Sequence, residues 1–262
     1  MMKFTRWALA LSLTLSVSAA WASSGSVELR KAHVDISDTA SLQRGAQLFI
    51  NYCLSCHEAR FMRYNRMGED LGLTDAQVTE NLMFAETKIG QTMTVAMRQA
   101  DGKAWFGTKI PDLSVIARSR GADWLYTYFT SFYVDEKRPF GVNNRVFKDV
   151  AMPHVLWELQ GMQHLVQPKS HATTGHEKPG HGDAHAAPHL ELVNKAELSP
   201  EEYHQRVSNY ERQVRDLVNF LVYVGEPAQS QRLDLGWRVI AFLFVFFIVA
   251  YLLKREYWRD VH

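Results

Sequence analysis

The chain has only two cysteines in its 262 residues, and both lie in the run Cys53-Leu54-Ser55-Cys56-His57. Cys-x-x-Cys-His is the attachment pattern of c-type haem. On a helical turn, two cysteines three residues apart reach the two vinyl groups on one side of a porphyrin. The histidine that follows projects toward the iron. The chain around this motif therefore has to fold about a large flat cofactor held by thioether bonds.

Three other uses of such a motif fit this sequence less well. A thioredoxin-like redox pair needs a preceding strand in a βαβ setting, and the sequence has no such pattern. A zinc site needs a second ligand pair, and no cysteine remains to supply it. A disulfide between cysteines three apart in a helix is strained. We expect one covalently attached haem c, with His57 as an axial ligand of the iron.

The N-terminal residues 1–22 have the three parts of a secretory signal peptide. Lys3 and Arg6 give the positive start, residues 8–20 give a short apolar stretch, and Ala20-Trp21-Ala22 gives the small-x-small cleavage pattern. A retained N-terminal anchor is the alternative. Cleavage removes two of the 29 basic residues and none of the 28 acidic ones. The remaining net charge of −1 argues against a nucleic-acid binder driven by basic charge.

A second apolar segment lies near the C-terminus. Residues 239–253 carry no charged side chain, and counting back to Leu233 gives 21 residues, about 31 Å of helix. This length matches the hydrocarbon core of a bilayer, so residues 233–253 are predicted to form a transmembrane helix. Three basic residues follow the span: Lys254, Arg255 and Arg259. They predict a cytoplasmic tail at 254–262, and a buried core helix is the alternative.

Helical patterns dominate the exported body, residues 23–232, and strand-like alternation is scarce. The clearest helix follows Ser199, which can cap it, with Pro200 at the first position and Glu202 as the capping-box partner. Its apolar positions then alternate in steps of four and three until Gly225. Shorter helices are predicted over 38–56, from the capping box of Thr74 and Gln77, from Asp112 through Arg120, and over 122–133. The predicted fold class is mainly α.

Residues 164–189 differ in composition from the rest of the body. Six histidines are spread there among Gly, Pro, Ala, Thr and Lys: His164, His171, His176, His181, His185 and His189. Such a stretch lacks the apolar content to bury itself, so a mobile surface loop is predicted. The functional alternative is weak binding of zinc, copper or nickel.

A second axial ligand for the iron must come from another segment. Among the seven methionines outside the signal, Met152 has the best setting, because it lies in an apolar loop where Pro153 prevents a helix. Met93 and Met97 are one helical turn apart and fit a packing face. His154 is the main rival of Met152, and a histidine ligand would give a lower potential.

Two further stretches fit the surroundings of a haem. The carbonyl of Pro111 can accept the free ring N–H of His57 and fix the orientation of the ring, and Leu113 can cover the porphyrin. Arg118 and Arg120 follow, and a guanidinium at this place can pair with a haem propionate. The alternative is that these arginines only solvate the end of a helix.

Taken in order, these motifs resemble the cytochrome c1 family, the haem subunits of ubiquinol–cytochrome c reductase, in its bacterial form. The matching runs are Arg44-Gly45, the Cys-x-x-Cys-His motif, Trp105-Phe106-Gly107, Pro111-Asp112-Leu113-Ser114, Ala117 to Asp123, Tyr126 to Phe129, Arg138 to Asn144, Ala151 to Leu156, Glu226-Pro227 and Arg232. One departure is Ile110, which stands where the family often has a first proline. The order of the later motifs is more specific than the haem motif alone.

The resemblance implies a c-type cytochrome domain with insertions and one C-terminal transmembrane helix. It implies His57 and Met152 as axial ligands and Arg120 near a propionate. It implies a relay that takes one electron from a Rieske iron–sulfur protein and passes it to a cytochrome c. Cytochrome b is the implied neighbour, in a dimeric complex of the inner membrane with the haem domain in the periplasm.

The functional expectation is an electron carrier without a catalytic substrate pocket of its own, in contact with membrane lipid and not with nucleic acid. The first alternative is the cytochrome c subunit of another respiratory complex, such as a terminal oxidase. A haem enzyme such as a peroxidase is a further alternative, and it would need an open iron position.

Overall fold

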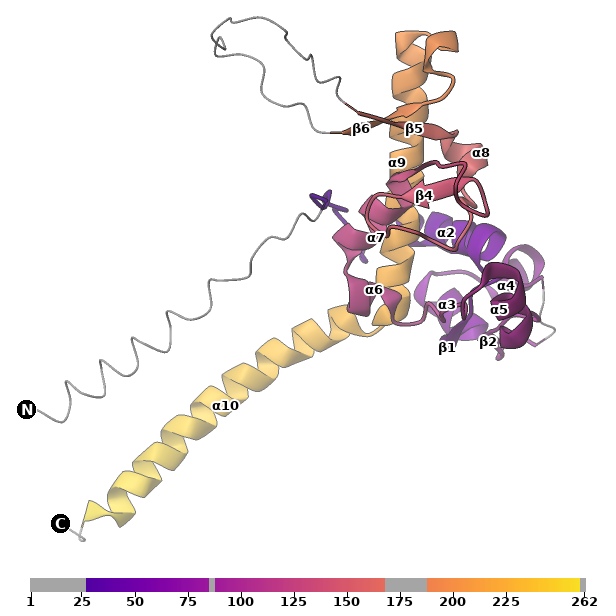
Figure 1. Cartoon of the computed structure of the whole chain (residues 1–262). Coiled ribbons are helices and arrows are strands. Elements are labelled where there is room, and N and C mark those ends of the chain that lie inside the picture. Colours follow the sequence, from indigo (N-terminus) through magenta and orange to yellow (C-terminus); the bar gives the residue numbers. More distant parts are fainter. Residues whose placement is uncertain (1–26, 85–87, 168–187, 260–262) are drawn as a thin grey trace, which may run out of the picture.

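The computed structural model describes residues 27–84, 88–167 and 188–259. The long helix α9 (Pro200–Gly225) runs through the body, and the shorter elements lie around it (Figure 1). Its N-terminus has the predicted capping box, in which the Ser199 and Glu202 side chains each accept from the backbone N–H of the other. The C-terminal half of α9 is largely buried, through Tyr210, Val214, Leu217, Val218, Phe220, Leu221 and Val224. The core of the molecule therefore forms along this helix.

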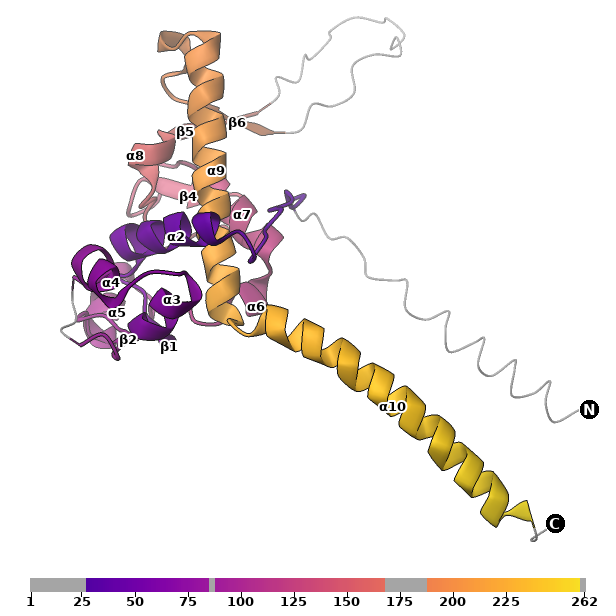
Figure 2. The same cartoon turned by 180° about the vertical axis from the view of Figure 1, so that it is seen from behind.

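Helix α2 (Thr39–Leu48) packs across α9 and positions the haem motif (Figure 2). The helices approach closely at Gly45, where an added Cβ would lie 2.7 Å from the Cβ of Phe220 and would overlap the backbone of Asp216. The buried carboxylate of Asp216 accepts from Ser41 Oγ at 2.7 Å and from Arg44 Nε at 2.6 Å. These contacts anchor the helix that leads into Cys53.

The helix predicted over 38–56 is not a regular α-helix over its whole length. It changes after Leu48 into a π-helical turn, η1 (Phe49–Cys53), in which the N–H of Leu54 donates to the carbonyl of Phe49 at 2.9 Å. A turn through residue 56 follows. The segment is therefore helical as predicted through Cys53, but its last part is a π-helix and the helix ends before Cys56.

The remaining helices are short. They are α3 (Tyr64–Asp70), α4 (Asp75–Leu82), α5 (Gln99–Phe106), α6 (Ile116–Arg120), α7 (Ala122–Thr130), α8 (Trp157–Gln160) and the 3-10 turn η2 (Lys195–Glu197). The capping box of Thr74 and Gln77 opens α4 as predicted. The observed fold is mainly α, which confirms the predicted class.

Two of the predicted helices have other boundaries. The helix expected from Asp112 begins at Ile116, because the Asp112 carboxylate accepts from the N–H of Ser114 at 2.7 Å and stabilises a turn. The helix expected over 122–133 ends at Thr130. Aromatic and β-branched residues follow and pair as a strand, which ends the helix early.

The structure contains three two-stranded antiparallel sheets in its described part. Strand β1 (Ala59–Arg63) pairs with β2 (Thr92–Met93), β3 (Phe132–Val134) with β4 (Val142–Asn144), and β5 (Gln163–Val166) with β6 (His189–Leu192). The last pair corrects the boundaries of the predicted loop 164–189, since both of its ends are strand. Val166 lies opposite His189 in the ladder, and residues 168–187 lie outside the described residues.

Helix α10 (Gln229–Tyr257) leaves the body at an angle to α9, and none of its residues is buried (Figure 1). Among the described residues, it is the one helix long and apolar enough to cross a membrane. It extends four residues beyond the predicted span 233–253 at each end. The proposed signal 1–22 and the last three residues of the proposed tail lie outside the described residues.

Candidate functional site

A cavity with about 1110 Å³ of space, including its open mouth, lies between η1, α7 and two loops. Its walls are mostly apolar. All seven residues singled out from the sequence line it: Cys53, Cys56, His57, Pro111, Leu113, Arg120 and Met152. The fold therefore brings together side chains that lie as far as 99 positions apart in the chain.

The haem motif enters the cavity at the end of the π-helical turn. The N–H of His57 donates to the carbonyl of Cys53 at 2.8 Å, which closes the turn that contains both cysteines. Cys53 is buried and Cys56 is partly exposed, and both are free thiols. Burial raises the pKa of the Cys53 thiol to about 12. Both cysteines line the cavity and could form thioether bonds to a porphyrin edge.

The imidazole of His57 has a fixed orientation. Its Nδ1–H donates to the carbonyl of Pro111 at 2.8 Å, which is the hydrogen bond expected from the sequence. The other ring nitrogen, Nε2, is left free to ligate a metal ion. Burial lowers the pKa of His57. The ring is thus held as a neutral imidazole, the form that binds iron.

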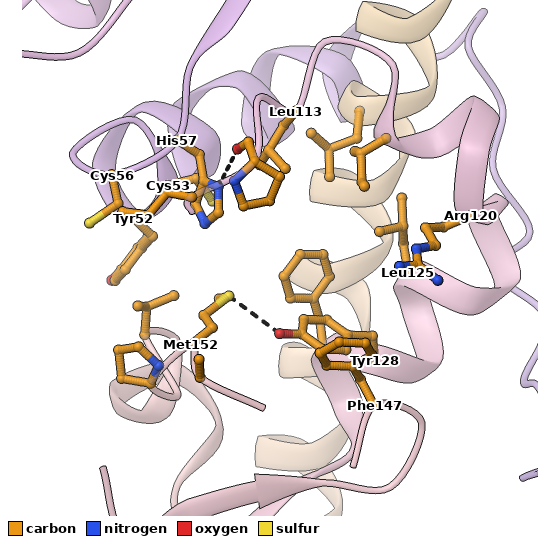
Figure 3. A pocket seen from close by; sticks show the side chains of 18 of the residues that line it. Tyr52, Cys53, Cys56, His57, Leu113, Arg120, Leu125, Tyr128, Phe147 and Met152 are labelled. Atoms are coloured by element: carbon orange, nitrogen blue, oxygen red, sulfur yellow. Dashed lines mark hydrogen bonds between the residues drawn. The ribbon is translucent and has the colours of Figure 1, made fainter. Parts of the chain in front are cut away.

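Met152 lies across the cavity from His57 (Figure 3). Its loop precedes α8, and the side chain is partly buried against the core. The Tyr128 hydroxyl on α7 donates to the Met152 Sδ at 3.4 Å. A neutral nitrogen and a thioether sulfur therefore approach the same space from opposite sides.

The structure separates Met152 from its rivals. His154 is buried in the core, where its ring stacks on Phe132 with centroids 4.8 Å apart. Burial lowers the pKa of His154 to about 4. Met93 is fully buried in β2. Among the described methionines, Met152 is the one that lines the cavity.

The two arginines of α6 point to different places. The Arg120 guanidinium lies over the ring of Trp124, with the central carbon 5.0 Å from the centroid, and it lines the cavity. The Arg118 guanidinium instead contacts the carboxylate of Glu226, with Nη1 3.2 Å from Oε2. Arg120 is therefore the arginine placed to meet a charged group at the cavity edge.

The cavity also has an aromatic wall, which the sequence patterns did not predict. Aromatic rings from four segments line it: Tyr52, Phe106, Trp124, Tyr128, Phe129 and Phe147. Trp124 and Tyr128 stack with centroids 5.0 Å apart and an interplanar angle of 10°. Their spacing of four on a helix is a signal that places two side chains on one face. Tyr52 lies in η1, Phe106 ends α5 and Phe147 lies in a loop, so no spacing within one helix links these rings to the pair on α7.

The residues present fit a c-type haem. The cavity combines two free thiols on one wall, a neutral imidazole and a thioether on opposite sides, and apolar or aromatic groups between them. Histidine with methionine is the ligand pair of high-potential c-type cytochromes. The arginine at the edge matches the charge of a propionate.

The chain is similar to known proteins over almost its whole length. A model of the cytochrome C1 family matches residues 30–166 and 184–261. A cytochrome c1 of Allochromatium vinosum is 46% identical over 254 residues, which cover 97% of this chain and 98% of that protein. A Nitrosomonas europaea protein named ammonia monooxygenase gamma subunit is 44% identical over 97% of both chains. A cytochrome c1 of Rhodobacter capsulatus is 22% identical over 84% of this chain. The chain therefore belongs to the cytochrome c1 family.

Proposed function

We propose that the chain is a membrane-anchored cytochrome with one haem, which relays single electrons from a Rieske iron–sulfur protein to a cytochrome c. The observation that carries this proposal is the placement of His57 and Met152 on opposite sides of one cavity, with both cysteines on its wall. Membership of the cytochrome c1 family gives the chain an electron-transfer role and a haem c cofactor. The electron donor and acceptor are our inference.

In this proposal each site residue has one task. Cys53 and Cys56 would hold the haem through thioether bonds, and His57 and Met152 would ligate the iron. Pro111 keeps the imidazole oriented through its carbonyl. Leu113 covers the ring, and Arg120 pairs with a propionate at the edge.

The ligand set explains why the role is electron transfer. The haem supplies a one-electron couple when bound. With both His57 and Met152 as ligands, the iron would keep no free position for a substrate. A thioether ligand raises the reduction potential compared with a second histidine, which suits the later part of a respiratory chain. The apolar walls around Met152 would shield the iron from water, which competes with a thioether for that position.

The proposed setting is a dimeric complex in the inner membrane. Residues 1–22 direct export and are removed, residues 23–232 form the periplasmic haem domain, 233–253 cross the membrane, and 254–262 stay in the cytoplasm. The neighbours are cytochrome b and the Rieske protein. Helix α10 supports a single anchor by its length and composition. A C-terminal reporter active only outside the cytoplasm would contradict this orientation.

A second candidate function comes from the relatives. The Nitrosomonas europaea protein carries the name of an ammonia monooxygenase subunit, although it matches the chain as fully as the cytochrome c1 does. A subunit of another respiratory complex, such as a terminal oxidase, belongs to the same alternative. Purification from membranes separates these candidates. Cytochrome b and a Rieske protein in the same fraction support the relay, and monooxygenase or oxidase subunits in their place contradict it.

The test of the site is Met152→Leu in the full-length protein. We expect the haem to stay attached, because Cys53 and Cys56 are unchanged. The sulfur-to-iron absorption band in the near infrared is expected to disappear, and the midpoint potential to fall. Met162→Leu is the matched control, because Met162 is also partly buried but lies outside the cavity. A Met152→Leu protein with the native band and potential would show that another residue is the ligand.

A further inference from the structure

Among the described residues, the Tyr128 hydroxyl has one hydrogen-bond partner, the sulfur of Met152, at 3.4 Å (Figure 3). A thioether sulfur has no proton, so it can only accept. The phenol must therefore donate its proton toward the sulfur. This contact joins α7 to the loop that carries Met152, across 24 positions of the chain.

The ring of Tyr128 is held in place from several sides. It stacks on Trp124 with centroids 5.0 Å apart, and Phe129 and Phe132 pack edge-on against it at 5.4 and 5.1 Å. The residue is 8% exposed. A phenol packed this way has little freedom to turn, so its hydroxyl has one direction in which to donate. The loop with Met152 lacks the hydrogen bonds of a helix, and its side chain gains order from this contact.

We propose that Tyr128 is a positioning residue for Met152, because its phenol holds one lone pair of the thioether and leaves the other directed into the cavity. This inference rests on the proposed function, in which Met152 ligates the haem iron. The thioether has two lone pairs, and a hydrogen bond to one of them selects which one faces the iron. Tyr128 acts only through Met152 and needs no contact with the haem.

The same hydrogen bond has an electronic consequence. A donor at the sulfur draws electron density away from it, so the sulfur donates less to the iron. Ferric iron depends on that donation more than ferrous iron does. The hydrogen bond therefore favours the reduced state, and its removal is expected to favour the oxidised state.

Tyr128→Phe in the full-length holoprotein tests this inference. The change keeps the ring and its stacking on Trp124 but removes the donor. We expect the near-infrared band to remain and to move in wavelength, because Met152 still ligates the iron with a more electron-rich sulfur. The ratio of reduced to oxidised protein at a fixed potential is expected to fall about threefold, the size of a typical net hydrogen-bond contribution. At about 59 mV per tenfold change, this equals about 28 mV.

Tyr126→Phe is the matched control. Tyr126 lies on the same helix and is also buried, but its ring contacts Arg30 and Arg215 and lies outside the cavity. We expect the native band and potential in this variant. A shift as large as that of Tyr128→Phe would show that any lost hydroxyl in α7 disturbs the site, and it would overturn the inference.

A second variant, in which the hydroxyl is a stronger donor, tests the inference if Tyr128→Phe does not fold. Incorporation of 3-fluorotyrosine at position 128 keeps the hydroxyl and makes it a stronger donor. We expect a higher potential, opposite in sign to the change in Tyr128→Phe. A fluorinated protein with the native band and potential would overturn the inference.

The outcomes separate this inference from the proposed function. Loss of the band in Met152→Leu, together with the native band and potential in Tyr128→Phe, leaves Met152 as the ligand and overturns only the role of Tyr128. A native band in Met152→Leu overturns the ligand itself. A shifted band and potential in Tyr128→Phe, with Tyr126→Phe unchanged, support the positioning role.

Discussion

Arg118 at the end of α6 contacts Glu226, the residue that ends α9, with Nη1 3.2 Å from Oε2. Arg232 on α10 contacts the same carboxylate. A hydrogen bond from Arg232 is the main cause that lowers the pKa of Glu226. One carboxylate thus joins three helices, at the place where the body meets the candidate membrane helix.

Glu226→Gln is expected to loosen this junction. The variant keeps the shape of the side chain but removes the charge that attracts both arginines. Trypsin then reaches Arg232 more readily, so the red, water-soluble body is released from membranes a few times faster. The measurement is the rate at which a fragment ending at Arg232 leaves the membrane. Glu211→Gln is the control, because it removes an ion pair with Arg30 elsewhere on the body. Equal release rates in both variants would contradict the role of Glu226.

Arg120→Ala is expected to lower the midpoint potential while the haem stays attached. The guanidinium lines the cavity, and its positive charge favours the reduced iron. A unit charge about 10 Å away in a water-like medium changes the potential by roughly 20 mV. Redox titration measures the potential of both variants. Arg118→Ala is the control, because Arg118 contacts Glu226 and does not line the cavity. A native potential in Arg120→Ala would place this side chain in solvent and away from any propionate.

Gly45→Ala is expected to reduce the free energy of unfolding by about 2 kcal/mol, because overpacked sites cost this much. The added Cβ meets the backbone of Asp216 and the Cβ of Phe220, which forces α2 away from α9. Gly90→Ala is the matched control, since an added Cβ there meets open space. Urea titration followed by far-ultraviolet circular dichroism measures both. Equal urea midpoints in Gly45→Ala and Gly90→Ala would show that the crossing of α2 and α9 tolerates a methyl group.

The stability contributed by Asp123 is expected to depend on pH. Its carboxylate accepts from Lys31 Nζ at 2.8 Å and from the N–H of Ala32 at 2.9 Å. The contact with Lys31 is the main cause that lowers the pKa of Asp123 below 3.8, its ordinary value. The contribution of Asp123 to the free energy of unfolding is therefore complete at pH values above the ordinary pKa. It is lost as the pH falls through the lower pKa of the folded state.

The measurement compares wild type with Asp123→Asn in urea at neutral pH and at about pH 3. Wild type is expected to be more stable at neutral pH, and the difference is expected to shrink in acid. Glu28→Gln changes an exposed carboxylate in the same N-terminal stretch and serves as the control. A difference between wild type and Asp123→Asn that stays constant with pH would contradict the prediction.

The sequence predicts best those features that depend on neighbouring residues. The capping boxes of α4 and α9 form as expected, because each needs only side chains three positions apart. The hydrogen bond from His57 to Pro111 also forms. The expectation that Met152 shares a cavity with the haem motif agrees with the structure. The role of each residue toward a haem remains a prediction.

Features that depend on tertiary packing were not predictable in this way. The change from α- to π-helix before Cys53 occurs where η1 packs against α9, with Phe49 on Phe220. No local pattern marks it. The donor to Met152 comes from Tyr128, and the partner of Arg118 lies 108 positions away in the chain. Such pairs exist only once α6, α7 and α9 have packed together.

The pairing of Val166 with His189 in the hairpin β5–β6 has a practical consequence. These two residues lie side by side in the sheet, so the β5–β6 pairing holds both ends of the intervening segment at one place on the body. The family model passes over residues 167–183 in the same region. This site is therefore a natural point for inserting a purification tag or a fluorescent protein, because neither Val166 nor His189 lines the cavity.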